Sequence, residues 1–403
     1  MEPKIRLKGF CGEWKGTTIG DIASVVGGGT PSTSNPAYWD GSIQWFTPSE
    51  VGNSRYVEKS ARTITEEGLE NSSARLIPAN SILLSSRATI GEASINICEC
   101  STNQGFQSLV PIDANLDFLY SLISTKKKNL LREANGSTFL EISANKVRSL
   151  AVYVPNIREQ KTIGVFFLHL DSLIQSTTKK IESLKQVKAA SLQSMFPQEG
   201  ETTPRVRFKG FDGKWNLVKL GDCLTINNER NQNNAYDIND VLSVSDEVGV
   251  VNQIKLLGRS YAGKSVSNYR ILKTNQIVYT KSPLKLKPYG IIKVNKDSTG
   301  IVSVLYAVYD TKENVFPDYI HYYFEPTHRI NNYLLPLINK GAKNTMNISD
   351  EMALTGTICI PSYDEQKKLA EYFKMLDSQI SLQSQRLEKL KQIKSACLDN
   401  MFV

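Results

Sequence analysis

The stretch PNIREQKTIGVFFLHLDSLIQSTTKKIESLKQVKAASLQSMF, residues 155–196, decides the fold, because it returns as PSYDEQKKLAEYFKMLDSQISLQSQRLEKLKQIKSACLDNMF at residues 361–402. The two copies are identical at 18 of 42 positions, with a constant offset of 206. Apolar residues recur in both copies with a period of about 3.5, which is typical of a helix in a coiled coil. The pattern predicts two long helices, one in each half of the chain.

The predicted seam of the two helices consists of Leu170, Ile174, Ile181, Leu184, Met195, Leu376, Ile380, Leu387, Leu390 and Met401. Some seam positions are polar in both copies, including Lys188 and Lys394, and such residues fix register at a cost in stability. Each helix would be roughly 55 Å long at about 1.5 Å per residue. We expect the helices to pair as an antiparallel coiled coil that serves as a partner interface. The alternative for a single copy is an amphipathic helix packed on its own domain.

A second repeat precedes each helix. Residues 3–22 match residues 204–223 at an offset of 201, with nine of twenty positions identical, from Pro3 and Pro204 onward. The material between the matched blocks, roughly residues 23–135 and 224–340, shows no convincing match. The chain is therefore a tandem duplication whose framing segments resemble each other while the enclosed domains differ.

The enclosed domains are predicted to be mixed. Short apolar runs divided by Gly, Pro, Asn and Ser indicate strands at residues 81–110 and 275–310, whereas residues 115–135 and 317–340 have a helical pattern. The expected fold class is α+β, with two mixed α/β domains separated by the two long helices in a pseudo-twofold repeat. The predicted segments are a first domain at 1–154, a first helix at 155–196, a linker at 197–204, a second domain at 205–360 and a second helix at 361–403.

Composition narrows the classes of function. The 403 residues include 48 Lys and Arg against 40 Asp and Glu, a net charge of +8, which favours a polyanionic partner such as nucleic acid. The chain has no apolar run long enough to cross a bilayer and no signal peptide, so we expect a cytoplasmic protein without a membrane partner. The six cysteines lack metal-site spacing, and with three histidines they predict reduced thiols and no metal site.

Two patterns imitate catalytic sites. Gly258 to Ser265 fits the phosphate-binding motif G-x-x-x-x-G-K-S, but the half-polar lead-in and the short stretch after Val266 do not provide the strand and helix that the motif needs. The Glu-Gln-Lys triplets at Glu159 and Glu365 resemble half of a nuclease centre, yet acids are favoured in a first helical turn. The sequence shows neither an Asn-Pro-Pro nor a Pro-Cys methyltransferase loop. We therefore predict no catalytic residue in this chain.

Four features together resemble the specificity subunits of type I restriction-modification enzymes. They are the segment Arg6 to Trp14 with its copy at 207–215, Gly29-Thr-Pro-Ser32 followed by Tyr38-Trp-Asp-Gly41-x-Ile43-x-Trp45, Ser137 to Ser143 leading into Pro155, and the helices that run from Glu-Gln-Lys to Met-Phe. The resemblance covers essentially the whole chain. It departs in the second half, where residues 341–349 only loosely echo 136–143 and no Thr-Pro-Ser or Tyr-Trp pair occurs.

The resemblance implies that each domain reads one half of a bipartite double-stranded DNA target and that the helices set the gap between the halves. It implies partnership with two methyltransferase subunits, which use S-adenosylmethionine, and with two restriction or motor subunits, which use ATP and Mg²⁺. Those cofactors would belong to the partners. The subunit itself would be no enzyme.

Residues for DNA contact are nominated by chemistry and by their place on expected loops, because Arg and Lys bind guanine or phosphate while Asn and Gln pair with adenine. The candidates are Thr30, Ser32, Arg87, Asn103 and Gln104 in the first domain, and Arg259, Lys264, Tyr269, Lys281 and Lys285 in the second. A solvated surface role is the alternative for each of them. Two other functions stay open: a nucleotide hydrolase built on 258–265, and a duplicated coiled-coil scaffold without a DNA role.

Overall fold

The computed structural model describes residues 1–403 except 137–139, 264, 282 and 341–345. It also leaves the side chains of residues 339, 340, 346 and 347 undescribed. The chain divides into two compact units, which we call unit 1 (residues 1–180 and 383–403) and unit 2 (residues 181–382). Each unit therefore contains one enclosed domain together with one part of each long helix.

The strands of unit 1 form two mixed sheets and one short antiparallel pair. The larger sheet has the order β2-β9-β6-β7-β4, the second has the order β5-β3-β8, and β1 pairs with β10. Only β4 with β7 and β3 with β8 run parallel among the paired strands of this unit. The strands are β1 (Lys15–Thr18), β2 (Ala23–Gly27), β3 (Trp39–Phe46), β4 (Tyr56–Val57), β5 (Arg62–Ile64), β6 (Ile82–Leu84), β7 (Ala93–Asn96), β8 (Cys100–Thr102), β9 (Gln107–Pro111) and β10 (Ala151–Val154).

Short helices and two long ones complete the secondary structure of unit 1. Asn115 caps α3 by accepting a hydrogen bond from Phe118 N, and Ser143 caps α5 by accepting one from Lys146 N. The helices are α1 (Ile19–Ile22), α2 (Glu66–Glu70), α3 (Leu116–Thr125), α4 (Lys127–Glu133), α5 (Ala144–Arg148) and the first part of α6 (Ile157–Ser194), joined by the last part of α10 (Tyr363–Met401). The predicted helical region 115–135 is thus α3 and α4.

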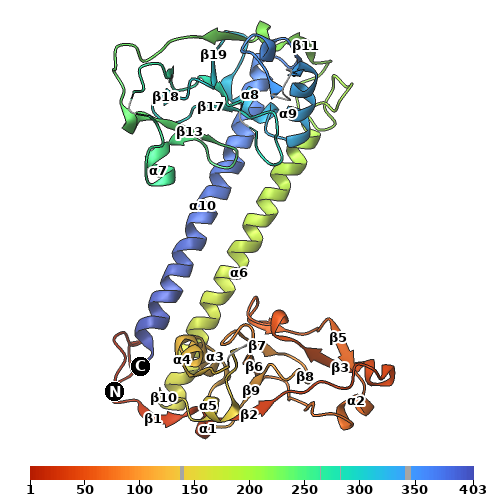
Figure 1. Ribbon diagram of the computed structural model, residues 1–403, viewed down its shortest axis with the longest axis vertical. Coiled ribbons are helices and arrows are strands. Elements are labelled where there is room, and N and C mark those ends of the chain that lie inside the picture. The colour runs from red at the N-terminus through yellow and green to blue at the C-terminus, as the bar shows by residue number, and fades with distance from the viewer. Residues whose placement is uncertain (137–139, 264, 282, 341–345) are drawn as a thin grey trace. The chain divides into compact units, whose positions relative to one another are not determined.

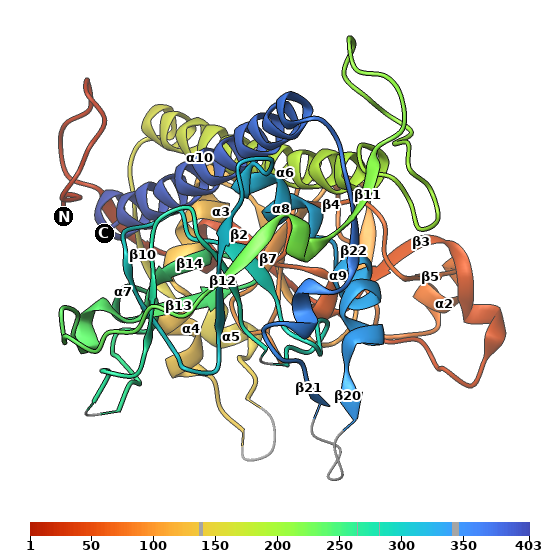
Figure 2. The same ribbon diagram turned by 90° about the horizontal axis from the view of Figure 1, so that it is seen from above.

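Unit 2 contains a four-stranded antiparallel sheet of order β12-β19-β16-β17 and several two-stranded pairs, β11 with β22 among them (Figure 2). The strands are β11 (Asn216–Lys219), β12 (Leu224–Asn227), β13 (Leu242–Ser245), β14 (Gly249–Asn252), β15 (Arg270–Leu272), β16 (Ile277–Tyr279), β17 (Ile292–Val294), β18 (Gly300–Val302), β19 (Ala307–Thr311), β20 (Asn339–Lys340), β21 (Met346–Asn347) and β22 (Thr357–Ile360). Its short helices are α7 (Gln253–Leu257), α8 (Pro317–Tyr323) and α9 (Thr327–Leu334).

The two units share a sheet framework that the sequence comparison did not reveal. The run β2-β9-β6-β7 in unit 1 has the same order and chain sequence as β12-β19-β16-β17 in unit 2. In both units α3 or α8 follows the framework, and β1–β10 or β11–β22 closes it. The predicted α+β duplication is confirmed, and the likeness extends into the enclosed domains.

A repeated group of four aromatic rings lies at the centre of each unit. In unit 1 Trp14 packs against Phe118 and Phe402, and Phe167 packs against Phe402, with centroid separations of 5.9, 6.2 and 5.7 Å. Their counterparts in unit 2, Trp215, Tyr319, Phe196 and Phe373, make the same contacts at 6.0 to 6.2 Å with Trp215 and at 5.9 Å between Phe196 and Phe373. Burial of such rings is a main source of stability, which explains why the Trp and the terminal Phe recur.

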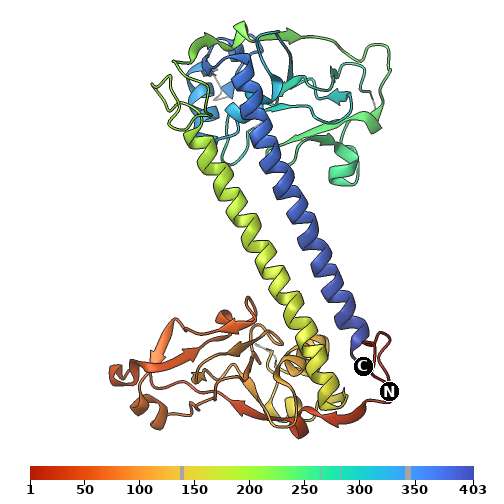
Figure 3. The same cartoon turned by 180° about the vertical axis from the view of Figure 1, so that it is seen from behind.

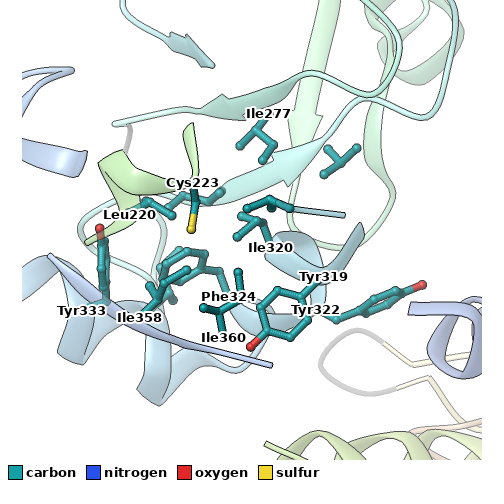
Figure 4. Packing of buried hydrophobic residues seen from close by; sticks show 14 of the residues in the cluster. Leu220, Cys223, Ile277, Tyr319, Ile320, Tyr322, Phe324, Tyr333, Ile358 and Ile360 are labelled. Carbon is teal, nitrogen blue, oxygen red and sulfur yellow. The ribbon is translucent and has the colours of Figure 1, made fainter. Parts of the chain in front are cut away.

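Apolar packing around these rings continues under the sheet of unit 2. Figure 4 shows Tyr319, Ile320 and Phe324 of the α8 region facing Ile358 and Ile360 of β22. Cys223 lies in the same cluster, and burial raises the pKa of its thiol to about 11. The thiol is therefore a packing group at neutral pH.

A repeated arginine in the segment that precedes each domain forms an ion pair with a glutamate at the start of a long helix. Arg6 donates two hydrogen bonds of 2.8 Å to the carboxylate of Glu159, and Arg207 donates two of 2.7 Å to Glu365. Both carboxylates are almost fully buried. The hydrogen bond that Arg6 donates to Glu159 raises the pKa of Arg6 and outweighs the smaller, opposite effect of burial. The Glu-Gln-Lys triplets are thus parts of a structural latch.

The long helices pair in opposite directions inside each unit (Figures 1 and 3). In unit 1 Lys394 of α10 lies 2.6 Å from Asp171 of α6, and in unit 2 Lys188 of α6 lies 2.6 Å from Asp377 of α10. The repeat offset relates these two ion pairs, so the polar seam lysines fix the same register twice.

The predicted seam residues divide between the units. Leu170, Leu390 and Met401 belong to the apolar cluster of unit 1, and Leu184, Met195 and Leu376 belong to that of unit 2. Ile181 is buried, whereas Ile174, Ile380 and Leu387 are half-buried. The apolar seam therefore lies mainly where each helix pair meets a domain.

Candidate nucleic-acid interface

Two tryptophans donate hydrogen bonds to the backbone of the segment Gly29–Ser32 in unit 1. Trp45 Nε1 donates a 2.9 Å hydrogen bond to Gly29 O, and Trp39 Nε1 donates one of 3.1 Å to Ser32 O. Gly29 N in turn donates to Thr102 O at 2.8 Å. These bonds satisfy the backbone of the segment from inside the protein, so the hydroxyl groups of Thr30 and Ser32 remain at the surface. These hydrogen bonds explain why the two tryptophans follow Gly29-Thr-Pro-Ser32 in the sequence.

Four of the five nominated residues of unit 1 lie around one turn. Thr30 Oγ1 donates a 2.5 Å hydrogen bond to Gln104 Oε1, and Asn103 Oδ1 accepts one of 2.8 Å from Gly105 N. A Cβ built on Gly105 would lie 3.6 Å from Cβ of Arg87. The loops after β2, β6 and β8 therefore bring amide, hydroxyl and guanidinium groups together. Ser32 is the fifth residue, exposed and hydrogen-bonded to Ser34 at 2.8 Å.

The nominated residues of unit 2 lie on two different loops. Arg259 is exposed and lies 4.6 Å from the ring of Tyr261, on the loop before β15. Tyr269 is half-buried against the cluster that contains Val266 and Ile271. Lys281 and the exposed Lys285 lie on the loop after β16. No hydrogen bond or ion pair joins Arg259 to this second loop within the described residues.

The phosphate-motif hypothesis fails in the structure. Gly258 has φ of +77° and ends α7, so the helix comes before the glycine instead of leaving the loop. Residues 259–269, apart from 264, contain no helix whose N-terminus faces this loop. Lys264, the lysine of the motif and a nominated DNA contact, lies outside the described residues, as do residues 137–139 and 341–345 of the family-like segments. The described geometry has no phosphate cradle of this type.

Sequence reasoning missed two acids and one arginine that lie beside the nominated residues. Glu141 pairs with Arg87 at 2.6 Å, and Asp350 pairs with both Lys281 and Arg270. Burial raises the pKa of the Asp350 carboxyl, but Lys281 and Arg270 outweigh burial and hold the pKa below its usual range. These acids come from distant parts of the chain, so no local pattern marks them.

Arg62 was missed as well. Its guanidinium lies 3.5 Å from the ring of Trp39, and its side chain is exposed beside the Gly29–Ser32 segment that Trp39 holds. Stacking on an indole keeps a guanidinium ordered while its N–H groups stay available for a phosphate or a base. The only sequence signal is its position in the strand next to Trp39.

Among the described residues, no three or more His, Cys, Asp or Glu side chains are arranged to hold a metal ion. No helix in the described part of the chain has the length and apolarity that a bilayer crossing needs.

The fold and interface define a class: a duplicated α+β protein that carries two different sets of polar loops on one repeated frame. Residues 12–186 match the family model of the type I restriction modification DNA specificity domain. These residues therefore belong to that family, and the resemblance to type I specificity subunits is confirmed.

Curated relatives agree with this assignment, and a solved structure has a similar fold. The type I restriction enzyme MjaIX specificity subunit of Methanocaldococcus jannaschii is 32% identical over 231 residues, 54% of this chain and 53% of that protein. The EcoR124I/EcoR124II specificity subunit of Escherichia coli is 34% identical over 175 residues, 41% of this chain and 43% of that protein. The chain thus spans about half the length of the curated relatives it matches. The S subunit of a type I system from M. genitalium has a similar fold, with a TM-score of 0.62 and 14% identity over 100% of this chain and 99% of that one.

Proposed function

We propose that this chain is the DNA-reading subunit of a type I restriction-modification complex and carries no catalytic centre. The observation that carries the proposal is the specificity-domain match over residues 12–186. The second domain has the same sheet framework. Each domain reads one half of a bipartite duplex target through its own loops, and the helices set the gap between the halves.

Different loops on a common frame support two different half-sites. Unit 1 presents hydroxyl and amide groups around Thr30 and Gln104, and the neighbouring Arg87 is already paired with Glu141, which suits direct contact with base edges. Unit 2 presents Arg259 and Lys285 on exposed loops, which suits phosphate contact as well as guanine. The two halves of the target would then differ in sequence and in how strongly salt weakens their binding.

Exposed residues that recur in both long helices support the proposal that two copies of one partner bind this chain. The packing and the latches account for the repeated Trp, Phe, Arg and buried Glu residues, but other repeated side chains face solvent. On one face of α6 they are Glu182, Lys185, Gln186 and Ala190, and on α10 they are Glu388, Lys391, Gln392 and Ala396. Residues spaced by three or four share a helix face. This repeated face would dock one methyltransferase subunit on each unit.

The cofactors and the cellular place follow from this assignment. The methyltransferase subunits would bind S-adenosylmethionine, and the two restriction or motor subunits would bind ATP with Mg²⁺. This chain would bind none of these cofactors. Their reactions take place on cellular DNA, and the chain would therefore work in the cytoplasm.

The reading function is tested by mapping methylated adenines after co-expression of the methyltransferase with and without this chain. We expect a split motif that appears only with the chain. Exchange of residues 23–150, which lie between the framing strands β1 and β10, for the same region of a related subunit should change one half of the motif and the gap should stay. Methylation that does not depend on the chain would refute the proposal.

Docking is tested by native mass spectrometry of the purified complex. Lys185→Glu or Lys391→Glu alone should remove one methyltransferase copy, and the double variant should remove both. Lys389→Glu is the matched control, because Lys389 is exposed on the same part of α10 while its repeat counterpart is Ser183. A complex that keeps both copies in the double variant would place docking elsewhere.

A further inference from the structure

A basic residue follows the same strand in both units and is paired with a carboxylate. In unit 1 Arg87 lies after β6, and its Nη2 is 2.6 Å from Oε2 of Glu141. In unit 2 Lys281 lies after β16 and pairs with Asp350. Strands β6 and β16 occupy the same place in the shared framework, between β9 and β7 or between β19 and β17. The loop is therefore common to the two units, although Arg87 is the third residue after its strand and Lys281 is the second.

The two acids come from positions that do not correspond. An Ile-Ser pair, Ile142-Ser143 and Ile348-Ser349, aligns the two segments at the repeat offset of 206. Glu141 comes just before this pair, whereas Asp350 comes just after it. A basic residue on the same loop is thus paired in each unit with a carboxylate that comes from a different place in the sequence. Inheritance of one ancestral residue does not explain this, so the pairing itself has a use.

The pair in unit 1 is placed where DNA can compete with it. The Arg87 and Glu141 side chains are 42% and 36% exposed, beside the turn that holds Asn103 and Gln104. A free arginine at this place would bind any phosphate, whatever the sequence. An arginine already paired with a carboxylate gains less from a phosphate, because the ion pair must first be broken.

We propose that Glu141 is a specificity-determining residue, which restrains Arg87 and so weakens binding of unit 1 to DNA of the wrong sequence. The inference rests on the proposed DNA-reading function. Glu141 acts through Arg87, and the target sequence releases Arg87 because base contacts by the neighbouring loops offset the loss of the ion pair. Asp350 restrains Lys281 in the same way, but that pair is more buried and Asp350 is also paired with Arg270.

The test compares binding of the full chain to a short duplex pool of randomised sequence and to the sequences recovered from its bound fraction. Glu141→Gln should tighten binding to the unselected pool by about two- to fivefold, the range that an exposed ion pair supplies. The salt dependence of that binding should steepen by about 0.9, the value for one added phosphate contact. Sequence preference should weaken in the half of the target read by unit 1 and stay in the other half.

Two variants separate this role from a general charge effect. Glu133→Gln removes a carboxylate that is similarly exposed and paired with Lys146 at 2.7 Å in the same unit, and it should leave the preference of both halves unchanged. Arg87→Gln combined with Glu141→Gln should abolish the tighter pool binding, because no cation is released.

Two outcomes would overturn the inference. One is a Glu141→Gln variant that behaves like Glu133→Gln. The other is a loss of affinity for the selected sequences with unchanged affinity for the pool, which would mean that Glu141 orients Arg87 for reading. If the wild-type chain recovers no preferred sequence in either half, the proposed DNA-reading function fails and this inference fails with it.

Discussion

The two units have one framework and two different loop surfaces, which we propose as the DNA-reading surfaces. Unit 1 adds the sheet β5-β3-β8 with its two tryptophans, whereas unit 2 adds the pairs β13-β14 and β15-β18 with α7. Residues 15–154 contain 12 Lys and Arg against 13 Asp and Glu, but residues 216–360 contain 16 against 13. The frame thus fixes where loops are presented, and the inserted elements decide whether shape and hydrogen bonds or charge dominate the contact.

The contrast also has a packing aspect. In unit 1 a Cβ on Gly28 would lie 2.0 Å from Asn103 O, and one on Gly29 would lie 2.3 Å from the backbone of Ser73, so two neighbouring segments leave no room for a side chain. In unit 2 the glycines of the long loop before β15, Gly258 and Gly263, have open space around them. Unit 1 should therefore tolerate change near its recognition loops much less than unit 2.

The largest expected effect is that of Gly28→Ala. A Cβ at this position would lie 2.0 Å from Asn103 O and 2.3 Å from Thr102 Oγ1, so the β8 turn must move. We expect unit 1 to lose about 3 kcal/mol of unfolding free energy, the upper range for overpacking. Denaturant unfolding followed by tryptophan fluorescence reports mainly on unit 1, because Trp14, Trp39 and Trp45 are three of the four tryptophans.

The matched control is Gly263→Ala in unit 2. No heavy atom lies within 4 Å of the added Cβ, and a stability change within about 0.5 kcal/mol is expected. Comparable losses of unfolding free energy in the two variants would contradict the inferred difference in packing between the units.

A smaller difference should appear on acidification. His321 of α8 is half-buried, its Nδ1 atom is buried without a hydrogen-bond partner among the described residues, and its counterpart in unit 1 at the offset of 201 is Tyr120. Burial lowers the pKa of His321 well below its usual value, and Lys293 and Lys188 lower it further. The unfolded chain then binds the proton first, at its ordinary pKa of about 6.5. Stability of unit 2 is therefore complete above that pH and falls below it, by up to about 1.4 kcal/mol per pH unit.

Hydrogen-exchange mass spectrometry at about pH 7 and pH 5.5 can follow both units in one sample, after correction for the intrinsic rates. Peptides of α8 should lose protection at the lower pH while those of α3 keep it, and His321→Gln should remove the difference. The lowered pKa values of Asp246 and Asp350 place their titration at more acidic pH. Equal protection of α8 at both pH values would contradict the assignment to His321.

Sequence reasoning predicted the framing parts of the fold and only some of the interface, for a physical reason. Helix α6 has 38 residues and α10 has 39, so their periodic seams are long enough to recognise. The strands of the framework have three to five residues, and apolar side chains replace one another freely there, so the two sheets match in space without matching in sequence.

The interface shows the same limit in particular residues. Thr30 and Gln104 are polar groups on loops and were nominated for that reason, but nothing local in the sequence links them across 74 residues. Glu141 lies 54 residues from Arg87 and Trp45 lies 16 from Gly29. Only the folded framework brings such groups together, so their roles emerge from the contacts.

The smallest expected effects concern the salt dependence of DNA binding, and they test the difference in charge between the two units. Lys285→Gln in unit 2 should reduce the slope of log affinity against log salt by about 0.9, the value for one phosphate contact, with little change in sequence preference. Thr30→Val in unit 1 keeps the charge and breaks the hydrogen bond to Gln104. It should weaken the preference for one base pair, by about 1–3 kcal/mol at most, and leave the slope unchanged.

Titration of binding to the recovered target at several salt concentrations measures both quantities for each variant. Lys285→Arg is the control for unit 2, because it keeps the positive charge at the same exposed loop and should restore the slope. A Thr30→Val variant with a reduced slope would show that unit 1 also depends on phosphate contacts at this segment. The two surfaces would then differ in the number of their cations and not in the way they read DNA.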